Sequence, residues 1–96
     1  MQSELVRAIE ERRYVTFIYD GVAREVQPAA LGDLTTGVLA LRCYQTAGGH
    51  VTSGHEWNLC KVEKIRQLQV LSKTFSENPP GYRRGDKQMV SVYAQL

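Results

Sequence analysis

The feature that most constrains the fold is a run of aromatic and β-branched residues that ends in an Asp-Gly dipeptide. Residues 14–19 read YVTFIY, which is typical of a strand because such side chains fit a pleated, half-buried surface. Asp20 and Gly21 follow, and both tolerate the positive φ that a two-residue hairpin turn requires. Residues 22–31 are expected to form the return strand, with Pro28 marking an edge or a bulge because proline cannot donate to a ladder. The chain is therefore predicted to contain an antiparallel hairpin.

A short helix is expected before this hairpin, and further strands are expected after it. Ser3 is the predicted N-cap of a helix over about residues 3–12, which must pack on the sheet because two or three turns do not hold alone. Five or six short strands with one leading helix predict a mainly β fold, a small antiparallel barrel whose last strand joins a sheet edge. The other expected elements are strands at 38–44, 55–62, 68–71 and 90–96, a tight turn at 63–66 and a flexible glycine-rich loop at 46–54.

Composition is that of an ordinary globular domain. The 96 residues are 43% hydrophobic and 23% charged, which is enough apolar material for one core. The net charge of +2 is too small to argue for nucleic-acid binding, although residues 61–96 hold seven Lys or Arg against three Asp or Glu. No apolar run of membrane-spanning length and no leader is present, so a cytoplasmic protein without a membrane partner is expected.

The order of these features resembles the WYL domain family over about residues 3–75. The resemblance implies an Sm-like, SH3-like barrel. In that family the barrel usually follows a DNA-binding helix-turn-helix in bacterial transcription regulators, and it is thought to sense a ligand that is often nucleic-acid-like. The matching features are the helix, an alternating strand, an Arg, a Pro, and an aromatic-x-Leu strand that runs into Lys-Val-x-x-Ile, formed by Val15, Phe17, Tyr19, Arg24, Pro28, Trp57, Leu59, Lys61, Val62 and Ile65.

The chain departs from the family pattern at several positions. Residues 39–41 read Leu-Ala-Leu where the family has Trp-Tyr-Leu, and Asn58 and Cys60 stand where the family has a basic and an acidic residue. Lys61 replaces an Arg, and Lys cannot reproduce a planar bidentate fork. No helix-turn-helix precedes the barrel, so a stand-alone, divergent member is expected.

The whole chain is expected to be one domain. Its parts are the helix at about 3–12, the barrel at about 14–75 and a C-terminal extension at about 76–96.

Ligand-facing roles carry over from the family at three positions only, Tyr19, Arg24 and Lys61. Taken by itself, Arg24 is more simply interpreted as a solvent-facing residue or as a partner for Asp20 or Glu25. The alternative is an anion contact beside Tyr19 or Lys61.

A second basic segment lies near the C-terminus. Tyr82, Arg83 and Arg84 combine an aromatic ring with cations. An ordinary solvated loop is the favoured interpretation, and a secondary contact to a nucleotide or to single-stranded nucleic acid is the alternative.

The cysteines and histidines indicate no site. Pairing Leu41 with Leu59 would put Cys43 in the core and Cys60 on the other face, which argues against a disulfide between them. The same register buries Phe17, Leu41, Trp57 and Leu59 together. The spacing of His50, His55 and Cys60 fits no compact metal motif, so neither a metal nor a cofactor is expected.

Functional motifs of enzymes are missing from the sequence. No serine elbow, paired carboxylates, phosphate loop or dinucleotide fingerprint appears, so enzymatic activity is not expected. The expected function is a ligand-sensing or regulatory binding module for an anionic, nucleotide-like or nucleic-acid-like ligand. The alternative is a protein–protein interaction or assembly module, including a homo-oligomer, that uses the C-terminal edge strand.

Overall fold

The hairpin around Asp20 and Gly21 lies at the centre of the fold. The computed structural model, which describes residues 1–49 and 51–96, pairs β1 (Arg13–Tyr19) with β2 (Val22–Leu34) in antiparallel orientation. Asp20 and Gly21 have φ values of 51° and 73°, the left-handed backbone that such a turn requires. The predicted hairpin is therefore confirmed.

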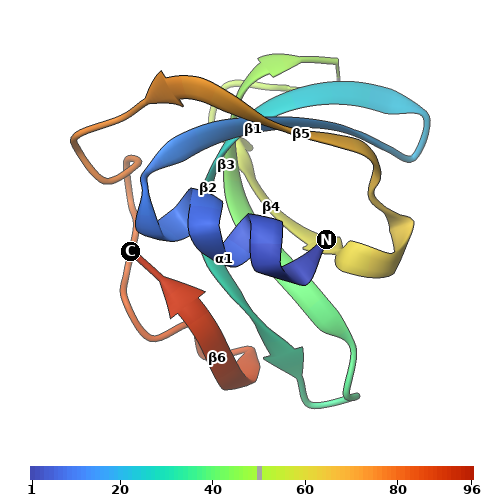
Figure 1. Cartoon of the computed structure of the whole chain (residues 1–96), viewed down its shortest axis with the longest axis vertical. Coiled ribbons are helices and arrows are strands. Elements are labelled where there is room, and N and C mark those ends of the chain that lie inside the picture. The colour runs from blue at the N-terminus through green and yellow to red at the C-terminus, as the bar shows by residue number, and fades with distance from the viewer. Residues whose placement is uncertain (50) are drawn as a thin grey trace.

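Six antiparallel strands form one curved sheet with the order β4-β3-β2-β1-β5 (Figure 1). The last strand, β6, pairs with the second half of β2, while β1 pairs with the first half. A mainly β, barrel-like fold of six strands with one N-terminal helix is thus confirmed. The remaining elements are α1 (Gln2–Glu10), β3 (Leu39–Gly48), β4 (Trp57–Lys61), the 3₁₀ helix η1 (Val62–Lys64), β5 (Arg66–Thr74) and β6 (Met89–Gln95).

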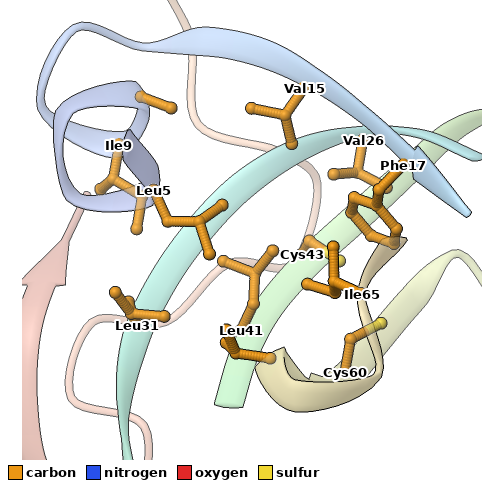
Figure 2. Packing of buried hydrophobic residues seen from close by; sticks show 12 residues of the cluster. Leu5, Ile9, Val15, Phe17, Val26, Leu31, Leu41, Cys43, Cys60 and Ile65 are labelled. Carbon is orange, nitrogen blue, oxygen red and sulfur yellow. The ribbon is translucent and has the colours of Figure 1, made fainter. Parts of the chain in front are cut away.

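The helix α1 packs against β1, β2, β5 and β6 (Figure 1). It places Leu5 and Ile9 in the core, where they meet Leu31 and Leu41 of the sheet (Figure 2). Its N-cap is Met1 rather than the predicted Ser3, and the helix ends at Glu10. Arg12 has a φ of 53°, in the left-handed region, which a right-handed α-helix cannot contain. The predicted helix end at residue 12 was therefore too late. None of the helices in the described part of the chain is long and apolar enough to cross a membrane.

Several strands extend beyond their predicted ends. Residues 46–48 belong to β3, where Ala47 lies opposite Glu25 and Gly48 opposite Arg24. The first part of the predicted loop at 46–54 is therefore strand, while His50 lies outside the described residues. The pairing of β2 with β3 shifts register between Pro28 and Ala30, which confirms the bulge expected near this proline.

The register of β4 differs from the prediction by one residue. Leu41 lies opposite Cys60, and Arg42 lies opposite Leu59. Cys60 is consequently buried in the core with Cys43, Phe17 and Leu41 (Figure 2). The prediction that Cys60 lies outside the core was wrong, and so was the prediction that Trp57 and Leu59 lie within it.

The two apolar residues of β4 that were expected in the core lie on the outer face of the sheet. Trp57 and Leu59 are half-buried. The C-terminal segment contacts this outer face, since the Trp57 Nε1 donates to the Pro80 carbonyl over 2.8 Å. Both faces of β4 are therefore partly covered, and alternation of apolar residues does not show which face is the core.

Candidate functional site

The three residues with expected ligand roles come together at one end of the barrel. Arg24 pairs with Phe17 across the hairpin, so it lies on the inner face of β2. Its guanidinium carbon is 5.4 Å from the centroid of the Tyr19 ring, and its Nη2 donates to the Tyr19 carbonyl over 3.3 Å. The Tyr19 hydroxyl accepts a hydrogen bond from the backbone N–H of Lys61 over 3.0 Å. Residues from β1, β2 and β4 thus form one connected cluster, which we call the Arg24 cluster.

Two donors of the Arg24 cluster have no acceptor among the described residues, the Arg24 Nε–H and the Tyr19 O–H. Within residues 1–49 and 51–96, the Arg24 Nε is buried and has no hydrogen-bond partner, and no ion pair joins Arg24 to Asp20 or Glu25. Glu25 instead pairs with Lys73 over 3.2 Å. The Tyr19 hydroxyl accepts from Lys61, so its own proton is free to be donated. Lys61 is exposed and joins the cluster only through its backbone N–H, because its side chain lies on the same side of β4 as Trp57 and Leu59.

Two buried thiols lie beneath Arg24. Hydrogen bonding from Cys43 lowers the pKa of Cys60 although burial opposes this, and the Arg24 charge adds to the lowering. The same hydrogen bond, together with burial, raises the pKa of Cys43 well above its usual range. Both thiols are free and no more than 1% exposed, so the core shields them from reagents in solvent.

A second group of functional side chains surrounds a pocket of about 440 Å³ on the outer face of the sheet. Tyr82, Arg83 and Arg84, the predicted secondary contacts, line this pocket together with Trp57 and Arg42. Tyr19, Arg24 and Lys61 do not line it, so the predicted primary and secondary contacts do not form a single site. Trp57 was not expected here because the predicted register placed it in the core, and no sequence motif pointed to Arg42.

The loop that carries the secondary contacts is tied to the sheet by an ion pair. The Arg42 Nε lies 2.8 Å from Asp86 Oδ2, with only 11% of the Asp86 side chain exposed. Burial raises the pKa of Asp86, but the hydrogen bonds from Arg42 and from the Gln88 backbone, together with the Arg42 charge, outweigh it and hold this pKa below its ordinary value. The ionised carboxylate therefore stabilises the position of the loop.

Groups of metal-ligating side chains do not assemble in the described part of the chain. No cluster of three or more His, Cys, Asp and Glu residues is found among residues 1–49 and 51–96. His50 lies outside that range, and Cys60 is enclosed in the core. The residues His50, His55 and Cys60 thus gain no support as a metal site.

Comparisons of this chain with protein-family models, with curated proteins and with solved structures found no match. The resemblance to the WYL domain stays a prediction that depends on the residues quoted for it.

Proposed function

We propose that this protein is a non-enzymatic binding module, ligand-sensing or regulatory in role, that holds an anionic or nucleotide-like ligand at the Arg24 cluster. The WYL-like order of features is one support for this proposal. The chemistry of the cluster is the other, because the guanidinium of Arg24 and the phenol of Tyr19 donate hydrogen bonds of the kind that carboxylate and phosphate oxygens accept.

The observation that carries the proposal is the unpartnered Nε of Arg24. A buried N–H without an acceptor costs roughly 1–3 kcal/mol, more when the group is charged. Within the described chain the ring of Tyr19 and one carbonyl are the contacts recorded for this guanidinium, and neither is an anion. An oxygen of a bound anion would satisfy the free N–H and balance the charge.

Calorimetric titration with inorganic phosphate and with nucleotides tests the proposal. We expect binding by the unmodified protein and a loss of at least about tenfold in affinity for Arg24→Ala, because charge-assisted hydrogen bonds are lost. Lys64→Ala is the matched control, since Lys64 is exposed and lies on η1, just beyond Lys61. Absence of binding, or an equal loss in both variants, would refute the proposal.

An assembly role is the second candidate, and the surface of β6 favours it. Among the described strands, β6 pairs only with β2, so no strand pairs with its other edge. Val90, Val92 and Tyr93 are 65%, 39% and 47% exposed. An edge strand with exposed apolar side chains is suited to pairing with another chain.

Light scattering coupled to size-exclusion chromatography tests this second role. If β6 joins two copies, the protein elutes as a dimer, and Val90→Lys/Val92→Lys converts it to a monomer. Val51→Lys is the control, because Val51 is 40% exposed and lies outside β6. A monomeric unmodified protein would exclude self-assembly through this edge.

A further inference from the structure

The pocket on the outer face of the sheet has a fixed aromatic wall. The ring of Trp57 stacks on Tyr82 at 6.3 Å between centroids with 29° between planes, and it meets the edge of Tyr44 at 5.3 Å. The indole N–H donates to the Pro80 carbonyl, and the Tyr82 hydroxyl donates to the Leu96 carbonyl, both over 2.8 Å. Because their polar ends are engaged inside the protein, both rings offer apolar surface to the pocket in a preset position.

The same pocket carries an excess of positive charge. Four cations and one carboxylate line it. The carboxylate, Asp86, is committed to Arg42. No hydrogen bond or ion pair within the described residues engages the side chains of Arg83, Arg84 or Lys87, and all three are exposed. Three uncompensated cations around one pocket attract a multiply charged anion.

The loop that presents these cations is anchored on both sides. Its first part is held by the Tyr82 hydroxyl, which donates to the Leu96 carbonyl over 2.8 Å. Its last part is held by Asp86 and by the Gly85 amide, which donates to the Gln95 side chain over 3.0 Å. Little further ordering is needed when a ligand enters, so less binding free energy is lost to entropy.

We propose that this pocket is a second ligand site that takes a nucleotide unit, with the base against the Trp57 and Tyr82 rings and the phosphate among Arg83, Arg84 and Lys87. A base presents a flat π surface that stacks on aromatic side chains, and phosphate oxygens accept from guanidinium and ammonium groups. The volume of about 440 Å³ is within the ordinary range for small-molecule sites. The site is independent of the function proposed for the Arg24 cluster.

Fluorescence titration reports on this pocket directly, because Trp57 is the single tryptophan of the chain. We expect adenosine monophosphate to quench Trp57, and Arg83→Ala/Arg84→Ala to weaken this binding by at least about tenfold. Arg7→Ala/Lys64→Ala is the matched control, since it removes the same charge from exposed residues that do not line the pocket. Its affinity should equal that of the unmodified protein.

Three further ligands test the base contact, the phosphate contact and the source of the nucleotide unit. Adenosine, which lacks the phosphate, should bind at least about tenfold more weakly than the monophosphate, and inorganic phosphate should neither quench Trp57 nor displace the nucleotide. A short single-stranded oligonucleotide that binds more tightly than the monophosphate identifies a nucleic-acid strand as the source of the nucleotide unit. Equal affinities identify a free nucleotide.

Repeating the titration with Arg24→Ala distinguishes this site from the Arg24 cluster. The quenching should persist unchanged in that variant, whatever the fate of the first proposal. The second site is refuted if neither the monophosphate nor the oligonucleotide quenches Trp57. It is also refuted if the control variant loses as much affinity as Arg83→Ala/Arg84→Ala, or if inorganic phosphate competes as well as the nucleotide.

Discussion

Arg24 holds a guanidinium on the inner face of β2, where a cation without a counter-ion is costly to keep. The Tyr19 ring, whose centroid lies 5.4 Å away, offsets part of this cost through a cation–π contact. One hydrogen bond to a carbonyl offsets another part, while the buried Nε is left unpartnered within residues 1–49 and 51–96. Such a residue contributes little to the stability of the fold.

Arg24→Met separates stability from binding. Met keeps an unbranched apolar side chain in the same space and removes the unpartnered N–H, so the free energy of unfolding should be unchanged or higher by about 1–2 kcal/mol. Anion binding to the Arg24 cluster should be lost. Urea unfolding measures the first effect and calorimetry the second, with Lys64→Met as the exposed control. A decrease of more than about 2 kcal/mol would mean that Arg24 is structural.

Asp86 makes the position of the C-terminal loop sensitive to acid. Its pKa in the folded protein lies below the ordinary 3.8, because the Arg42 and Gln88 interactions outweigh the effect of burial. The ion pair therefore makes its full contribution to the stability of the folded protein above the ordinary pKa of Asp86. This contribution is lost as the pH falls through the lowered pKa of the folded state.

We predict that Trp57 emission shifts to the red below about pH 4, as protonation of Asp86 frees the loop that covers this ring. Asp86→Asn should show part of this shift already at neutral pH and a flatter acid profile. A fluorescence-monitored pH titration of both proteins measures this. Identical profiles would show that Asp86 does not hold the loop.

At the scale of elements, β4 determines which side chains reach the core and which reach the pocket. Leu41 opposite Cys60 buries the even-numbered side of this strand and turns Trp57 outward. A shift of one residue would reverse every side chain of the strand.

Alanine substitutions on the two faces of the β3–β4 pair test this register. Leu41→Ala should lower the free energy of unfolding by about 2–5 kcal/mol, because Leu41 is completely buried. Leu59→Ala should cost clearly less, since Leu59 is only half-buried on the outer face. Thermal and urea unfolding measure both values. Equal losses would favour the register in which both leucines share the core.

The docking of β6 depends on the absence of a side chain at Gly32. A Cβ at this position would lie 2.2 Å from the Ser91 carbonyl oxygen and 2.9 Å from the Met89 sulfur. Gly32→Ala should therefore displace β6 and destabilise the fold by about 1–3 kcal/mol. Amide exchange should become faster in residues 89–95 and stay slow in β1. Unchanged protection of β6 would contradict the observed pairing.

Most of the strands could be predicted from the sequence, while the face of β4 could not. Local chemistry determines the hairpin, since Asp20 and Gly21 suit only a tight turn and Pro28 suits a bulge. Trp57 and Leu59 alternate as core residues do, and the segment that covers them is distant in sequence. Local patterns therefore singled out Tyr82, Arg83 and Arg84 but not Trp57, which stacks on Tyr82 in the structure.

At the scale of the whole molecule, β4 connects the Arg24 cluster to the pocket on the outer face. Its last residue, Lys61, belongs to the Arg24 cluster, and its first residue, Trp57, belongs to the pocket on the outer face. The Arg24 cluster is assembled from residues of β1, β2 and β4. The pocket is assembled from residues of the sheet and of the C-terminal segment. The two proposed anion sites would therefore share this one strand.

A nitrogen–proton correlation spectrum recorded during titration with adenosine monophosphate and with inorganic phosphate tests the binding function most directly. The Arg24 Nε–H, unpartnered in the structure, gives its own resonance. We expect this resonance and the amides of Tyr19 and Lys61 to shift with either ligand, and the two amides to stop shifting in Arg24→Ala. If the Arg24 Nε–H and its neighbours stay unperturbed at saturating ligand, the Arg24 cluster does not bind anions and the proposed function is wrong.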